Sequence, residues 1–240
     1  MRGPVVAAIL VALVTTLLTA DEIPGEKMAV SQSVQSYLKA REAEFDQIPA
    51  ERKAELRKIA TYVQTRAHAN QPIKLTCICT HNSRRSQMSQ IWAAAAARYY
   101  GIRGVETYSG GTEATAFNPR AVAAMQRAGI LIEKTNSLVQ GEFDANPRYA
   151  VRFVDGEPAL ICYSKVHHET PNPKSEFCAI MTCSQADNSC PVVSGCSLRV
   201  AITYDDPKAS DNTSKEAATY DERCQQICRE MSYLFSQVER

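Results

Sequence analysis

Short apolar runs alternate with longer amphipathic stretches along most of the chain. The runs are typical of buried strands, and the amphipathic stretches repeat apolar residues at the spacing of one helix face. Gly101 and Gly104 end the first of these helices, and Gly129 ends the second. The alternation predicts an α/β fold with a central, mainly parallel sheet of four strands. Strands are expected at 74–80, 105–109, 177–182 and 199–204, and helices at 86–100, 119–128 and 220–238.

Two further helical stretches precede this core, between residues 27 and 70. Val34 and Leu38 in the first stretch, and Leu56 and Val63 in the second, fall at helical spacing. Pro49 is expected to open the second helix. We expect a helical hairpin packed on the main domain rather than a partner-binding arm.

The segment 149–163 is predicted to form a β-hairpin inserted into the domain. Two apolar runs, 149–154 and 159–163, flank the sequence Asp-Gly-Glu-Pro, which is typical of a turn.

Composition and charge are those of an ordinary globular protein. The 240 residues are 45% hydrophobic and 22% charged, and the formal net charge is +1. Because positive and negative charges nearly cancel, there is no reason to expect a nucleic-acid or polyanionic partner. Any recognition of an anion must therefore be local.

The first 20 residues have the pattern of a signal peptide. Arg2 precedes an apolar run from Val5 to Ala20, which Asp21 and Glu22 end. The run has roughly 16 residues, whereas a membrane span needs about 20. We expect export, to the periplasm, with cleavage after Ala20. The alternatives are an uncleaved anchor, which would give weak membrane association, and a cytoplasmic protein whose start is mis-assigned.

Nine cysteines are many for a chain of this length. Export would permit structural disulfides, and the odd count leaves at least one thiol free. Cys224 and Cys228 lie on the apolar stripe of the last helix, so they are expected to be core residues. Spacing leaves the pairing of the following cysteines open: Cys77, Cys162, Cys178 and Cys196.

The segment from Cys79 to Ser86 joins a predicted strand to a predicted helix. A helix N-terminus exposes unpaired amides and carries partial positive charge, so a loop that wraps into it can surround an oxyanion. The same field favours the thiolate of Cys79, the nucleophilic form. Arg85 can bind two oxygens of a tetrahedral anion, and Ser86 can donate to the sulfur. The expected anion-binding residues are Thr80, His81, Asn82, Ser83, Arg84 and Arg85.

Two alternatives remain for this loop. Cys79 could be an ordinary core residue and Arg85 a surface charge. Cys77, Cys79 and His81 could bind a metal ion, although no second pair of ligands at a suitable spacing is evident.

Displacing an oxygen from phosphorus or arsenic requires a proton donor to the leaving group. Asp205 and Asp206 follow a predicted strand, and parallel strands end at the ligand-binding edge of such a sheet. Pro207 would stiffen the loop. We expect Asp206 to be the general acid, with Asp205 as second choice and an ordinary turn as the alternative.

Cys183 and Cys190 follow the strand at 177–182 and are seven residues apart. Seven helical residues rise about 10.5 Å, whereas a disulfide tolerates a Cα separation of about 7 Å. The two thiols can therefore pair only if the segment unwinds, as in a redox switch. Two unrelated buried cysteines, or a static disulfide across a loop, are the alternatives.

Together these motifs resemble a known superfamily. The sequence Cys79–Gln87 resembles the phosphate loop of low-molecular-weight protein tyrosine phosphatases, and is closer to the thioredoxin-coupled arsenate reductases that share their fold. Asp206-Pro207 resembles their acid loop. The stretch from Met181 through Cys190 resembles the redox segment of the reductases, which plain phosphatases lack. Residues 108–112, 118–120 and 128–130 resemble the second strand and helix of the superfamily. The whole resemblance covers roughly residues 72–238.

The resemblance implies a three-layer low-molecular-weight phosphatase fold over 72–240, preceded by a helical extension at 21–71 and the segment 1–20. It implies that Cys79 attacks arsenate, with Arg85 holding the oxygens and Asp206 protonating the leaving hydroxyl. Cys183 then attacks Cys79 and expels arsenite, and Cys190 closes a Cys183–Cys190 disulfide. Thioredoxin or a similar external dithiol would reduce it, and neither a metal nor another cofactor is implied.

Two residues depart from the superfamily pattern. His81 stands where glycine is usual, and Arg84 replaces a small residue or cysteine, so either could shift the substrate preference.

A phosphatase acting on phosphotyrosine or a small phosphoester through Cys79 is the second hypothesis. A non-enzymatic thiol or metal-binding module is the third.

Overall fold

A central parallel sheet organises the protein. The structure, a computed structural model, describes residues 30–135, 145–154 and 156–239. Four parallel strands lie in the order β2-β1-β6-β7. This confirms the predicted α/β class, and the first three strands lie close to their predicted positions. The strands are β1 (Ile73–Cys79), β2 (Val105–Gly111), β6 (Phe177–Met181) and β7 (Cys196–Ala201).

The fourth strand begins and ends earlier than the sequence predicts. Cys196 already pairs with Phe177, and the last paired residue is Ala201. Beyond it the chain stays extended, because the amides of Ile202 and Tyr204 still bond to carbonyls at the end of β6. The apolar pattern at 199–204 therefore includes the extended segment that leads to the predicted acid loop.

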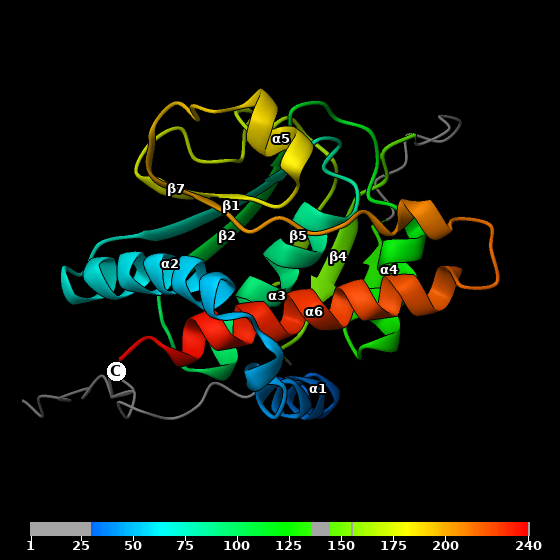
Figure 1. Ribbon diagram of the computed structural model, residues 1–240, viewed down its shortest axis with the longest axis horizontal. Coiled ribbons are helices and arrows are strands. Elements are labelled where there is room, and N and C mark those ends of the chain that lie inside the picture. Colours follow the sequence, from blue (N-terminus) through cyan, green and yellow to red (C-terminus); the bar gives the residue numbers. More distant parts are fainter. Residues whose placement is uncertain (1–29, 136–144, 155, 240) are drawn as a thin grey trace, which may run out of the picture.

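Helices cover both faces of the sheet (Figure 1). Helix α5 and the chain after it lie on one face, whereas α2 and α3 contact the opposite face and α6 packs behind them. The helices are α1 (Gln32–Glu42), α2 (Ala50–His68), α3 (Arg85–Tyr99), α4 (Pro119–Arg127), α5 (Ser184–Ser189) and α6 (Glu216–Ser236), with short 3₁₀ turns η1 (Phe45–Gln47) and η2 (Pro207–Ser210).

The two N-terminal helices pack on the main domain and share its core. Val34 and Leu38 of α1 and Leu56 of α2 are fully buried in one cluster with residues of the sheet and of α3 and α6. The ring of Tyr37 stacks on that of Trp92, with centroids 5.1 Å apart. Helix α2 begins directly after Pro49, as predicted.

A second, antiparallel sheet lies beside the first. The predicted hairpin is present as β4 (Tyr149–Arg152) and β5 (Leu160–Cys162). A third strand that the sequence did not predict, β3 (Leu131–Lys134), pairs with β4. Its pattern is too weak to detect, because only one of its four residues is buried.

Within the described ranges, no helix is long and apolar enough to span a bilayer. The predicted signal peptide at 1–20 and the turn residue Asp155 lie outside those ranges.

Candidate active site

The carboxyl edge of the central sheet gathers the residues that the sequence singled out. Cys79 is the last residue of β1, and α3 begins at Arg85, so the intervening loop enters a helix N-terminus. Cys183 follows β6, and Asp206 follows the extended end of β7. Parallel strands bring these segments to one edge, as predicted.

Neighbouring segments hold the carbonyl groups of this loop. The amides of Thr112 and Glu113, just after β2, donate to the carbonyls of Cys79 and Thr80, and the amide of Asn118 donates to Ser83. In the part of the chain that the structure describes, the amides of residues 81–86 have no acceptor. Buried amides are normally paired, so this unpaired set is available to an anion.

The sulfur of Cys79 lies at the base of the loop, and the residue is only 3% exposed. Its Sγ is 3.1 Å from Ser86 Oγ. Asn82 donates from Nδ2 to the same Oγ at 2.8 Å. Because Ser86 accepts from Asn82, its own hydroxyl proton is free to be donated to Cys79. This is the contact predicted for Ser86.

Arg85 reaches from the first turn of α3 to the predicted acid. Its Nη2 is 2.7 Å from Asp206 Oδ2, and its Nη1 donates to the carbonyl of Tyr204 at 3.1 Å. The side chain is 11% exposed, so it does not extend into solvent. Its Nε is buried and has no acceptor among the described residues. One donor of the guanidinium fork is thus unused.

The geometry distinguishes the two candidate acids. Asp206 is 30% exposed and lies beside Arg85, where it also caps η2 by accepting from the amide of Lys208. The carboxylate of Asp205 is 98% exposed and lies 3.7 Å from Arg223. Asp206 is therefore the one that faces the loop.

Cys183 and Cys190 lie at the two ends of α5. Cys183 is the N-cap, where its Sγ accepts from the amide of Ala186 at 3.3 Å, and Cys190 is the C-cap. Cys183 Sγ is 3.4 Å from the hydroxyl of Thr80, the residue after Cys79. Cys79 and Cys183 are both buried in one apolar cluster. The partly exposed Cys190 and Cys196 pack against this cluster.

Five of the remaining six thiols are buried in the main core. All nine cysteines are free. Cys224 and Cys228 are buried in the core, as predicted, and burial raises the pKa of both, that of Cys224 to about 12. Burial also raises the pKa of Cys77, Cys162 and Cys178. No group of three or more His, Cys, Asp and Glu within the described residues could hold a metal ion, so the alternative site at Cys77, Cys79 and His81 is not formed.

Comparison with known proteins bears directly on this arrangement. The family model for low-molecular-weight phosphotyrosine protein phosphatases matches residues 74–154. Arsenate reductase 2 of Staphylococcus haemolyticus is 32% identical over 133 residues, which is 54% of this chain and 75% of the relative. The chain belongs to the superfamily of low-molecular-weight phosphatases and arsenate reductases. It is therefore an enzyme rather than a non-enzymatic thiol module.

Two further similar proteins share less sequence identity with the chain. The arsenate reductase of Bacillus licheniformis is 28% identical over 147 residues, covering 61% of this chain and 82% of the relative. A solved low-molecular-weight phosphotyrosine phosphatase from Vibrio cholerae aligns with a TM-score of 0.44 and 13% identity over 68% of this chain and 95% of that one.

Arg84, which departs from the superfamily pattern, ties the loop to the start of α6. Its Nε donates to the hydroxyl of Tyr220 at 2.9 Å and lies 3.8 Å from Asp206, and its Nη2 is 3.7 Å from Asp211. The sequence predicted Arg84 as an anion ligand, but its guanidinium is already surrounded by these three groups. Tyr220 and Asp211 had no sequence signal, because they are separated from the loop by more than a hundred residues.

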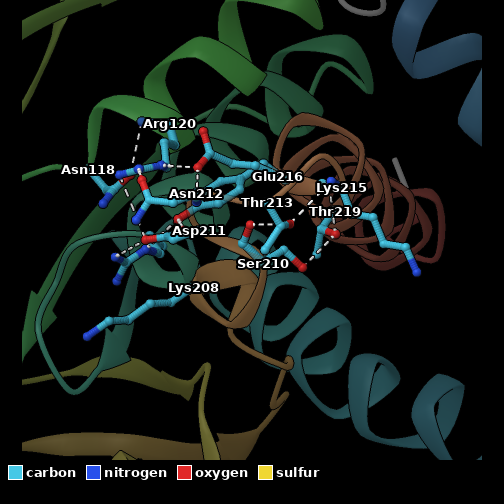
Figure 2. Close-up of polar contacts among 12 residues, drawn as sticks. Asn118, Arg120, Lys208, Ser210, Asp211, Asn212, Thr213, Lys215, Glu216 and Thr219 are labelled. Carbon is cyan, nitrogen blue, oxygen red and sulfur yellow. Dashed lines mark hydrogen bonds and ion pairs between the residues drawn. The ribbon is translucent and has the colours of Figure 1, made fainter.

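A second arginine extends this network. Figure 2 shows Arg120, at the start of α4, reaching across to the chain after η2. It contacts Asn212 at 2.7 Å and Glu216 at 2.8 Å, and its Nη1 is 3.8 Å from Asp211. Helix α4, the phosphate loop and the acid loop are thus linked through one set of charges.

His81, the other departure, does not face the anion loop. Its Nε2 is 2.9 Å from the carboxylate of Glu113, and both side chains are partly exposed. The carbonyl of His81 accepts from Ser164 and Thr115. The imidazole therefore lies at the rim, bound to Glu113.

Sequence reasoning missed the segment that supports Asn82 from behind. The amide of Lys165 donates to Asn82 Oδ1 at 3.0 Å, and Gln87 donates to the same oxygen at 3.2 Å. Lys165 is itself buried, which lowers the pKa of its amine to about 8. Only a contact between distant parts of the chain identifies this support, so no local pattern could have predicted it.

Proposed function

We propose that this enzyme reduces arsenate to arsenite through a thiol adduct on Cys79 and a disulfide cascade that ends at Cys183 and Cys190. The observation that carries the proposal is the position of Cys183, 3.4 Å from Thr80 in the same apolar cluster as Cys79. A phosphatase needs only the first thiol, whereas a reductase needs a second thiol within reach of it.

The first step uses the loop and the acid. The Cys79 thiolate attacks arsenic, and one oxygen leaves as water after Asp206 protonates it. The free amides of residues 81–86 and the unused Nε of Arg85 bind the remaining oxygens. In this step the anion takes the place of Asp206 on Arg85 Nη2, which opens the covered sulfur and releases the acid to act.

The second step transfers the electrons. The thiolate of Cys183 attacks the sulfur of Cys79, an S–S bond forms, and the electron pair of the sulfur–arsenic bond passes to arsenic, which leaves as arsenite. Cys190 then attacks Cys183, and Cys79 departs as a thiolate. Two thiols are oxidised for each arsenic reduced, so an external dithiol of the thioredoxin type must regenerate the enzyme.

The reductant must work in the same compartment as the enzyme. We propose that the 1–20 segment directs export, so the dithiol would be a periplasmic thioredoxin-like protein. Recovery of the full-length product in the cytoplasmic fraction, with its N-terminus intact, would contradict this assignment.

The test is multiple-turnover arsenite production with a thioredoxin system, on the natural chain and on Cys183→Ser. The natural chain is expected to turn over continuously, and Cys183→Ser to produce none beyond background. Full turnover by Cys183→Ser would remove the basis of the proposal.

Phosphoester hydrolysis is the second candidate, because the matching family model describes phosphotyrosine phosphatases. It would need only Cys79, Arg85 and Asp206, with phosphate in place of arsenate. Release of phosphate from an aryl phosphate without any thiol reductant, undiminished in Cys183→Ser, would favour it, whereas no detectable release would count against it.

A further inference from the structure

The C-terminal end of α5 is held by an arginine from the neighbouring strand. Arg199 of β7 donates to the carbonyl of Cys190 from Nε at 3.2 Å and from Nη2 at 3.0 Å. The same Nη2 contacts Asp187 twice, at 2.8 Å to its carbonyl and at 2.6 Å to its carboxylate. Both side chains are about three-quarters covered.

These contacts stabilise a helix that is too short to be stable alone. Isolated helices below about 12 residues are marginal in water, and α5 has six. The last carbonyls of a helix have no partner within it, and a cation there also favours the helix dipole. Arg199 supplies both the donors and the charge.

The Cys183–Cys190 disulfide is incompatible with this helix. Residues seven apart on a helix are separated by about 10.5 Å, beyond the roughly 7 Å that a disulfide allows. Closing the disulfide must therefore displace the carbonyl of Cys190 from Arg199. The contacts of Arg199 belong to the dithiol form alone, so they stabilise that form relative to the disulfide.

We propose that Arg199 is a positioning residue that holds α5 in its dithiol form and thereby sets the reduction potential of the Cys183–Cys190 pair. This inference rests on the proposed cascade for the identity of the pair, but not on arsenate as the oxidant. It gives Arg199 two effects: Cys183 stays at its place beside Thr80 until Cys79 carries an adduct, and the disulfide is easier for an external dithiol to reduce.

The test is a redox titration in dithiothreitol buffers, with differential alkylation and fragmentation mass spectrometry to count each thiol. Arg199→Ala is expected to shift the equilibrium constant about tenfold toward the disulfide, the loss of one charge-assisted hydrogen bond. Tenfold corresponds to a potential about 30 mV more negative. Asp187→Asn, which keeps Arg199, is expected to shift it the same way by less.

Arg127→Ala is the matched control. Arg127 and Asp221 form a pair of the same 2.6 Å length between α4 and α6, away from α5, so its loss should leave the midpoint unchanged. If the natural chain, Arg199→Ala and Asp187→Asn all have the same midpoint, the role of Arg199 is overturned while the proposed cascade stands. Absence of any Cys183–Cys190 disulfide in the natural chain would overturn both this role and the cascade. If Arg199→Ala does not fold, Asp187→Asn decides the question.

Discussion

At the scale of single residues, Asn82 fixes the shape of the phosphate loop. It has a φ of 46°, in the left-handed region, and is fully buried. Its amide group donates to Ser86 and accepts from Lys165 and Gln87. Asparagine tolerates this backbone better than other non-glycine residues and also satisfies the buried donors around it.

Asn82→Ala should therefore destabilise the protein by about 2–4 kcal/mol, because it adds left-handed strain and leaves the Lys165 amide unpaired. Asn82→Gly removes the strain but not the unpaired amide, so it should be about 1 kcal/mol more stable than Asn82→Ala. Urea unfolding measures both. Equal stability of the two variants would show that the backbone of Asn82 stores no strain.

Asp206→Asn should lower kcat for an aryl phosphate or arsenate by about a hundredfold or more, since it removes the proton donor. Asp205→Asn is the control, and its rate should stay within about twofold because that side chain is 98% exposed and lies beside Arg223. A similar loss in both variants would mean that the pair acts only through its charge.

The sequence predicted where the candidate site residues lie better than it predicted the contacts that support them. Cys79, Arg85, Ser86 and Asp206 follow from their places between a strand and a helix, or after a strand, which is local information. Arg84 was expected to bind the anion, because it lies within the loop. The structure instead directs it to Tyr220 and Asp211, and only the packing of α6 against the loop could have revealed that.

At the scale of elements, the long periodic segments were predictable and the short ones were not. Helix α6 shows a clear apolar face, α3 is buried on most of its surface, and β6 is a continuous apolar run. Strand β3 was not predicted, because residues 135–148 separate it in the sequence from its partner β4. Its first residue, Leu131, is also 52% exposed, so the strand has no buried apolar run. Helix α5, with six residues, was not predicted, and its contacts with Arg199 depend on the packing of β7.

Helix α1 should behave as part of the core rather than as a removable extension. Leu38 is fully buried, so Leu38→Ala should cost about 2–5 kcal/mol in the free energy of unfolding. Its exposed neighbour provides the control, and Lys39→Ala should change stability by less than about 0.5 kcal/mol. A cost for Leu38→Ala as small as that of the control would show that α1 contributes nothing to the main domain.

At the scale of the whole molecule, buried thiols make stability sensitive to alkaline pH. The pKa of each is raised above the unfolded value of about 8.5, so the folded state keeps a proton that the unfolded chain loses. Their stabilisation is complete below about pH 8.5 and is lost as the pH rises. Lys165 acts in the opposite sense, because burial lowers its pKa to about 8 and its cost disappears between about pH 8 and 10. The thiols are Cys77, Cys162, Cys178, Cys224 and Cys228.

Because five thiols oppose one lysine, the free energy of unfolding should fall between pH 9 and pH 10, measured by urea unfolding in the presence of reductant. Each thiol contributes a slope of up to about 1.4 kcal/mol per pH unit. Cys228→Ala should therefore flatten the dependence by up to that amount. A pH-independent stability in this range would contradict the burial of these thiols.

At the same scale, one edge of the sheet gathers the residues that the proposed reaction needs. Strands β1, β6 and β7 place Cys79, Cys183 and Asp206 at one end of the sheet, and α1, α2 and α6 share the core of the domain. The superfamily membership and the fold agree with this arrangement, while the reaction itself depends on whether Cys183 reaches Cys79.

A single-turnover trap tests that point most directly. The Cys190→Ser variant is incubated with arsenate in the absence of reductant. It lacks the thiol that would attack Cys183 and release Cys79. The account predicts that a Cys79–Cys183 disulfide accumulates in mass spectra in step with released arsenite, up to one per chain. Arsenite released while Cys79 stays a free thiol, or a folded variant that forms neither arsenite nor this disulfide, would contradict it.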